Sequence, residues 1–182
     1  TNADLSITSP ATYTVTVTGT GGCTATAAII VSQNTTPPTA GITNNSGGLT
    51  ELNCTTTAIN VTATGGTSYS WDGGATPATA ANSFTTAGTY TVTVTGANGC
   101  TETAPITITK DVTPPTAGIT NNTGSTELTC ATTAISVTAT GGGTYSWSDG
   151  TTGFGTNADL SITSPATYTV TVTGTGGCTA TA

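Results

Sequence analysis

The five cysteines are the residues of this sequence whose type and spacing could do chemistry. Cys23, Cys100 and Cys178 follow one another at intervals of 77 and 78 residues, and Cys54 and Cys130 lie 76 residues apart. A zinc site would need about four Cys or His ligands, but the sequence has no histidine and no C-x-x-C pair. Regular cysteine pairs in a small, loop-rich domain are typical of disulfides in an oxidising compartment. We therefore expect disulfide bonds and no bound metal.

Two disulfide pairings are open. Within one repeat, Cys54 would join Cys100 and Cys130 would join Cys178. Between repeats, Cys54 would join Cys178, and Cys100 would reach back to the preceding domain. In an immunoglobulin-like sandwich, the turns that carry the two cysteines of one repeat lie at opposite ends of a strand. A strand of seven to nine residues separates those ends by about 25–30 Å, whereas bridged Cα atoms lie at most ~7 Å apart. This limit favours pairing between repeats, and pairing within a repeat is the alternative.

Other reactive groups are sparse. A catalytic triad or a general base would commonly use histidine, and none is present. The acidic residues are scattered, so the sequence predicts neither an enzyme nor a cofactor. Asp72 and Asp149 lie beside glycines and could contribute to a calcium site. Calcium usually takes six to eight oxygen ligands, several of them from carboxylates, so we favour solvated aspartates in turns.

The charge balance excludes several partners. The formal net charge is −7, and lysine and arginine together contribute one residue. Nucleic acid is excluded, because phosphate binding needs clusters of basic side chains. An anionic membrane surface is disfavoured for the same reason. No apolar run approaches the roughly 20 residues that cross a bilayer, so no membrane insertion is expected.

Internal repeats define the domain organisation. Residues 1–27 recur letter for letter as residues 156–182. The offset between these two copies is 155 residues, and a looser repeat of 77 residues, about half of it, begins at Pro37 and again at Pro114, each time as Pro-Pro-Thr-Ala-Gly-Ile-Thr-Asn-Asn. The repeats predict the C-terminal part of one domain at 1–36, a whole domain at 37–113, and a domain with a truncated last strand at 114–182. We expect the sequence to be part of a longer array.

Each repeat has the pattern of a small all-β domain. Apolar and polar residues alternate over 58–64 and 89–95, which is the period of a strand. Asn98-Gly99 is a strong hairpin signal. Seven or so short strands separated by turns are typical of a β-sandwich with immunoglobulin-like topology. The core is expected to be built around four aromatic side chains: Trp71, Trp147, Tyr90 and Tyr168.

Two runs of sequence carry a resemblance to a known family. One is Gly-x-Tyr-Ser-Trp, which ends at Trp147. The other is Ala-Gly-Thr-Tyr-Thr-Val-Thr-Val-Thr-Gly-Ala-Asn-Gly-Cys, which ends at Cys100. They resemble the PKD-like and immunoglobulin-like tandem repeats of Bacteroidota cell-surface adhesins, with gliding-motility repeats of the SprB type as the nearest match. The resemblance implies PKD-like sandwich domains in a linear array, within a long secreted protein that acts as an adhesin or filament.

The sequence therefore predicts a structural repeat module of a long extracellular, cell-surface filament or adhesin stalk. Its expected partners are neighbouring repeats of the same chain, stapled by disulfides, and other chains in a self-assembled fibre. The alternative is an adhesin domain that binds a glycan or another surface through its loops. The loops at 75–83 and 151–159 differ most between the two repeats and are the candidates for that role.

Overall fold

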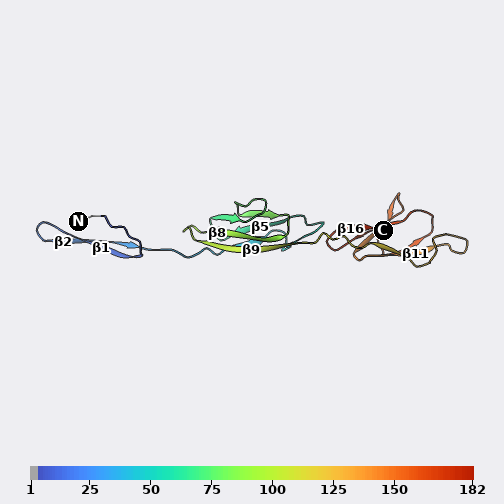
Figure 1. Cartoon of the computed structure of the whole chain (residues 1–182), viewed down its shortest axis with the longest axis horizontal. Coiled ribbons are helices and arrows are strands. Elements are labelled where there is room, and N and C mark those ends of the chain that lie inside the picture. The colour runs from blue at the N-terminus through green and yellow to red at the C-terminus, as the bar shows by residue number, and fades with distance from the viewer. Residues whose placement is uncertain (1–3) are drawn as a thin grey trace.

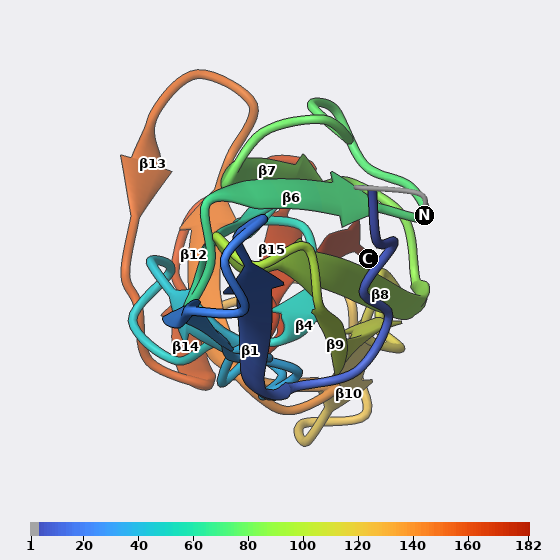
Figure 2. The same cartoon turned by 90° about the vertical axis from the view of Figure 1, so that its left-hand side faces the viewer.

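A computed structural model describes residues 4–182 of the chain and contains strands, turns and no helix within that range. The strands form five sheets. Figure 1 shows three groups of strands that follow one another along the longest axis, and Figure 2 looks along that axis from the N-terminal side. We call these groups the N-terminal hairpin (residues 4–31), the middle unit (37–113) and the last unit (114–182).

The middle unit has two sheets, with strand orders β3-β5-β7 and β4-β9-β8-β6. All neighbouring strands are antiparallel except β4 and β9, which run parallel. The strands are β3 (Gly41–Asn44), β4 (Glu51–Leu52), β5 (Ile59–Thr64), β6 (Ser68–Trp71), β7 (Ala81–Phe84), β8 (Gly88–Thr95) and β9 (Thr101–Lys110).

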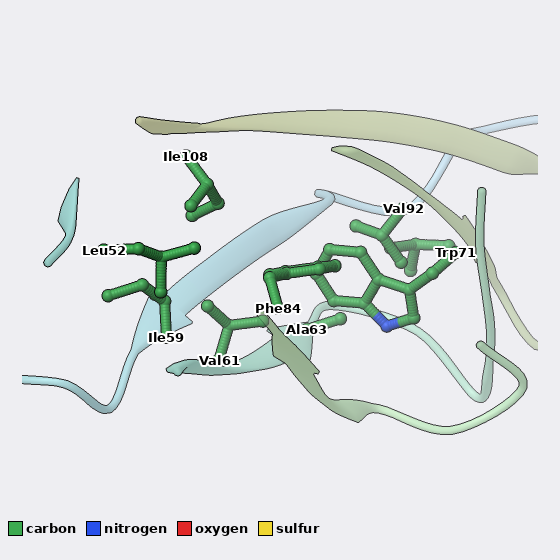
Figure 3. Close-up of a cluster of buried hydrophobic side chains, with 9 residues drawn as sticks. Leu52, Ile59, Val61, Ala63, Trp71, Phe84, Val92 and Ile108 are labelled. Atoms are coloured by element: carbon green, nitrogen blue, oxygen red, sulfur yellow. The ribbon is translucent and has the colours of Figure 1, made fainter. Parts of the chain in front are cut away.

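Alternation along the strands of the middle unit sends apolar side chains into one core between the two sheets. On β5, Ile59, Val61 and Ala63 are buried while the residues between them are exposed or half-buried. Trp71 and Phe84 meet edge to face, with ring centroids 5.5 Å apart. Figure 3 shows these side chains packed into one continuous cluster that ends at Leu52, Ile59 and Ile108. This burial is the main force that closes the two sheets on each other.

The last unit has the same plan, with strand orders β10-β11-β14 and β13-β12-β15-β16. Its buried side chains form a second core around Trp147, which is 1 % exposed. The strands are β10 (Gly118–Asn121), β11 (Ile135–Thr140), β12 (Thr144–Ser148), β13 (Gly153–Phe154), β14 (Asp159–Ile162), β15 (Thr169–Thr173) and β16 (Thr179–Thr181).

The N-terminal hairpin pairs β1 (Ala11–Thr18) with β2 (Thr24–Val31) and has no covering sheet in the described structure. Val15 and Val17 are 57 % and 61 % exposed, although Val170 and Val172 of the identical sequence are fully buried. The same letters therefore form the same antiparallel pair whether or not a second layer covers them.

Two strands of the middle unit are short. β4 has two residues, because a turn begins at Asn53. β7 has four residues and is preceded by a loop. That loop is fixed by Asn82, a buried polar residue whose amide donates to the Gly73 carbonyl at 2.8 Å. Its carbonyl oxygen accepts from the backbone N–H of Thr76 at 3.0 Å, which satisfies both ends of the buried amide.

The core aromatics divide into two kinds. Trp71 and Trp147 are buried, and each indole N–H donates to a loop carbonyl at 3.0 Å. Tyr90 and Tyr168 are half-buried, because each phenol reaches the surface and donates to the carbonyl four residues earlier. Tyr13 makes the same bond to Ser9 in the N-terminal hairpin. This contact is a tyrosine corner, a feature of immunoglobulin-type sandwiches.

Gly143 gives a test of the packing between β12 and β15. It has a φ of 89°, and a Cβ on it would collide with the Thr173 carbonyl oxygen. Its neighbour Gly142 has a φ of 74° but open space around it. Gly142→Ala should therefore cost about 1–2 kcal/mol from the left-handed backbone alone. Gly143→Ala should cost about 1–3 kcal/mol more, because the paired strand must move. Calorimetric melting of both variants measures the difference, and equal losses would contradict the packing.

Candidate functional site: the disulfide-linked junction

The middle and last units are joined by a disulfide between Cys54 and Cys178, with Cα atoms 5.0 Å apart and a sequence separation of 124 residues. This confirms a bridge between repeats, the pairing that strand length favours. The alternative bonds within one repeat, Cys54–Cys100 and Cys130–Cys178, are not formed.

A short asparagine-capped turn presents Cys54. The turn follows β4, and the Asn53 side-chain oxygen accepts from the backbone N–H groups of Thr55 and Thr56 at 3.1 and 2.7 Å. The Thr55 hydroxyl donates to the same oxygen at 2.9 Å. These local bonds hold the cysteine at the tip of the turn, at the end of the middle unit that faces the last unit.

Cys178 lies in the hairpin turn between β15 and β16. The Gly174 N–H donates to the Cys178 carbonyl at 2.8 Å, which closes the turn, and the cysteine side chain is buried against the facing loop. A Cβ at Gly176 would lie 3.2 Å from the Asn53 Cβ, and one at Gly177 would collide with the Thr55 methyl group. The two glycines thus let the facing turns approach closely enough for the sulfur atoms to bond.

The linker between the units is fixed to both of them. The Asp111 N–H donates to the Leu52 carbonyl at 2.9 Å, and the Asp111 carboxylate accepts from the Thr113 N–H at 2.9 Å. The hydrogen bonds from Thr113, backbone first and side chain second, lower the pKa of Asp111 below its ordinary value. A Cβ on Gly176 of the last unit would lie 3.8 Å from the Asp111 carbonyl oxygen. The disulfide is therefore a second connection beside an ordered linker.

A cleft of about 300 Å³ lies at this junction, and its lining includes Glu51, Asp111, Thr113, Thr175 and Cys178. Two carboxylates are fewer than calcium usually takes. Within residues 4–182, no group of three or more His, Cys, Asp or Glu side chains could hold a metal ion. The features of the junction that hold the two units together are therefore its covalent bond and its close packing.

The junction between the N-terminal hairpin and the middle unit uses hydrogen bonds instead. The Asn98 amide donates to the Thr36 carbonyl at 2.9 Å and to the Asn34 carbonyl at 3.3 Å. Asn98 is the counterpart of Gly176 and Ala97 that of Thr175, so the two turns differ at two positions. The sequence shows that Asn98-Gly99 corresponds to Gly176-Gly177. It does not show what each turn contacts, because those contacts are made by residues of the facing segment.

The other three candidate cysteines form no disulfide within the described residues. Cys23 and Cys130 are exposed, and Cys100 is half-buried. For Cys100, the predicted bond to a preceding domain is not made.

The two candidate calcium ligands accept hydrogen bonds within their own units. The Asp72 carboxylate accepts from the Thr91 N–H at 2.9 Å. The Asp149 carboxylate accepts from the N–H groups of Thr151 and Thr152, each at 2.9 Å, and from the Thr151 hydroxyl at 2.7 Å. Both side chains therefore already have partners within their own unit.

Asp149 should titrate at unusually low pH. Hydrogen bonds from Thr152 and then Thr151 lower its pKa from 3.8 to about 2. Its folded pKa lies below the unfolded one, so the turn gains stability above pH 3.8 and loses it as the pH falls through about 2. NMR titration of the Thr151 and Thr152 amides should give a midpoint near 2, and a midpoint near 3.8 would contradict these bonds.

No helix in residues 4–182 is long and apolar enough to cross a membrane. The sequence matches no protein-family model, and comparison with curated proteins finds no match.

Proposed function

We propose that this chain is a structural repeat module of a long extracellular, cell-surface filament or adhesin stalk. The observation that carries the proposal is the Cys54–Cys178 disulfide, which joins the facing ends of two consecutive units. A covalent link at that position gives neighbouring units a second connection beside the linker.

The immunoglobulin-like type of the units is part of the proposal. Each unit has two facing sheets of antiparallel strands, apart from the parallel pair β4 and β9, around one core. Tyr13, Tyr90 and Tyr168 each form a tyrosine corner at equivalent positions. These features support tandem immunoglobulin-like or PKD-like sandwiches arranged in a line, the type that the sequence resemblance implies.

An extracellular location agrees with the chemistry of the junction. Disulfides persist in oxidising compartments and are rare in the cytosol. The near-absence of lysine and arginine also leaves few sites for trypsin-like proteases. A stalk needs both properties, because it stays exposed outside the cell, and it needs no catalytic group.

Imaging of intact source cells tests the proposal. Antibodies raised against the folded 182-residue chain should label thin filaments that project from the cell surface. Cells opened by detergent should show no additional internal pool of mature protein. Labelling confined to the cytosol, with all five cysteines present as thiols, would contradict the proposal.

A loop difference favours one second candidate, glycan or surface binding. The loop before β7 is built around the buried Asn82, whereas the last unit has the short strand β13 between β12 and β14. Variable loops on a constant scaffold are common binding sites. A glycan array probed with the full chain tests this role. Saturable binding that Asn82→Ala abolishes would support glycan binding. If the chain binds no glycan, the stalk role is the one that remains supported.

A further inference from the structure

The hairpin turn between β8 and β9 contains Asn98-Gly99, the only Asn-Gly pair in the sequence. Glycine has no Cβ, so no side chain shields the backbone nitrogen that follows the asparagine. The Gly99 nitrogen can attack the carbonyl carbon of the Asn98 side chain and close a succinimide ring. The two groups belong to neighbouring residues, so this reaction needs no enzyme.

The Asn98 amide also holds a junction together. Its nitrogen lies 2.9 Å from the Thr36 carbonyl oxygen, 3.3 Å from the Asn34 carbonyl oxygen and 3.2 Å from the Asn34 side-chain oxygen. Asn34 and Thr36 lie in the segment that leads from the N-terminal hairpin to the middle unit. Every atom that the amide nitrogen meets in these contacts is a hydrogen-bond acceptor, so this position requires a donor.

While the junction is closed, both reacting groups are hydrogen-bonded. The Gly99 N–H donates to the Gly96 carbonyl at 3.0 Å, and the Asn98 side-chain oxygen accepts from the Cys100 N–H at 3.1 Å. Water still reaches the turn, because Asn98 and Gly99 are exposed and a Cβ on Gly99 would meet no atom within 4 Å. Ring closure must first break these hydrogen bonds, so the closed junction slows the reaction without preventing it.

We propose that Asn98 is a site of spontaneous, irreversible modification, and that its conversion to aspartate or isoaspartate opens the junction between the N-terminal hairpin and the middle unit. Both products carry a carboxylate in place of the amide. A carboxylate accepts hydrogen bonds and donates none, so the contacts with Asn34 and Thr36 are lost. The new negative charge also faces the oxygen atoms that bound the amide.

The reaction balances with solvent water as the one co-reactant. The Gly99 nitrogen bonds to the Asn98 side-chain carbon and gives up its proton, and the side-chain nitrogen takes up that proton and leaves as ammonia. Water then adds to either carbonyl of the ring and breaks its bond to the Gly99 nitrogen. Opening at the side-chain carbonyl gives aspartate, and opening at the main-chain carbonyl gives isoaspartate. No electrons are transferred, so no oxidant is needed.

The disulfide-linked junction has no such site. The counterpart of Asn98 there is Gly176, which carries no amide, and the neighbouring Cys178 is bonded to Cys54. Of these two junctions, the hydrogen-bonded one therefore changes with time and the covalent one does not change by this reaction. The inference does not depend on the stalk role, because it leaves the disulfide intact.

Ageing of the full chain tests the modification. One sample is kept folded at mildly alkaline pH, which favours loss of the Gly99 proton, and a second is kept in urea at the same pH. After unfolding and reduction, cleavage after Asp and Glu gives peptide 73–102, and fragmentation of this peptide distinguishes Asn98 from Asn82. Isoaspartate makes the peptide heavier, and aspartate at position 98 adds a cleavage site.

We expect both products in both samples, formed about tenfold or more faster in urea, where the protecting hydrogen bonds are absent. An Asn98 amide that stays intact in the folded chain would overturn the inference, as would equal conversion of the asparagines outside the Asn-Gly pair. Equal rates in the two samples would contradict the protection by the closed junction.

Two variants test the effect on the junction. Spin labels on the N-terminal hairpin and the middle unit should give a narrow distance distribution in the fresh chain and a broad one after conversion. Asn98→Asp should give the broad distribution from the start. Asn98→Gly copies the turn at Gly176 and has no side-chain amide, so ageing should not change its distribution. A converted chain that keeps the narrow distribution would contradict the opening of the junction.

Discussion

Replacing Trp71 by alanine should strongly destabilise the middle unit and leave the stability of the last unit unchanged. Trp71 is 4 % exposed, packs edge to face on Phe84, and donates its indole N–H to the Thr79 carbonyl. Removing a buried tryptophan costs about 3–5 kcal/mol. A small domain has roughly 5–15 kcal/mol in total, so the middle unit should lose most of its stability.

The remaining tryptophan makes the measurement selective. In Trp71→Ala, fluorescence comes from Trp147, which belongs to the separate core of the last unit. Urea unfolding followed by this fluorescence should keep the midpoint of the last unit, while circular dichroism shows that strand structure is lost at lower urea. Thr91→Ala, on the outward face of β8, is the control and should change neither curve. A single cooperative transition for both signals would contradict two independent cores.

Removing the disulfide should free the two units to bend against each other. In Cys54→Ser, the middle and last units keep the linker at Asp111 but lose their second connection. The bond also closes a loop of 124 residues in the unfolded chain, for which the chain-entropy model gives about 5 kcal/mol. Its loss should therefore lower the free energy of complete unfolding and broaden the range of distances between the units.

Spin labels on exposed residues of the two units measure this freedom. The distance distribution should be narrow in the parent chain and broad in Cys54→Ser. Cys130→Ser removes the equivalent cysteine of the last unit, which is unbonded, and should leave the distribution narrow. If both variants behave like the parent, the linker alone holds the units and the disulfide has no mechanical role.

The alternation of apolar and polar residues predicted the main strands, because the side chains on one face of a strand recur at every second position of the sequence. Residues 59–64 and 88–95 form strands close to their predicted bounds, with Val61, Val92 and Val94 buried. Strand length also favoured the disulfide between repeats, because the distance between the ends of a strand is longer than a bond within one repeat can span, and the pairing within a repeat stayed open as the alternative.

Other features depended on contacts that no local pattern contains. Nothing in the sequence around Asn82 distinguishes it from an exposed turn residue, because its partners lie six to nine positions earlier in a loop of unpredicted shape. The close approach at Gly176 depends on Asn53 in a different unit. The burial of a strand face also depends on the rest of the unit, because Val15 and Val17 are exposed on β1 whereas Val170 and Val172 of the identical sequence are buried under a second sheet.

Non-reducing peptide mapping of the 182-residue chain, folded at low concentration, tests the central claim most directly. Cleavage after Asp and Glu separates Cys54 on peptide 52–72 from Cys178 on 160–182 and Cys100 on 73–102. A disulfide-joined array of units predicts that peptide 52–72 is recovered joined to 160–182. Recovery of 52–72 joined to 73–102 would place the bond inside one unit and contradict the account.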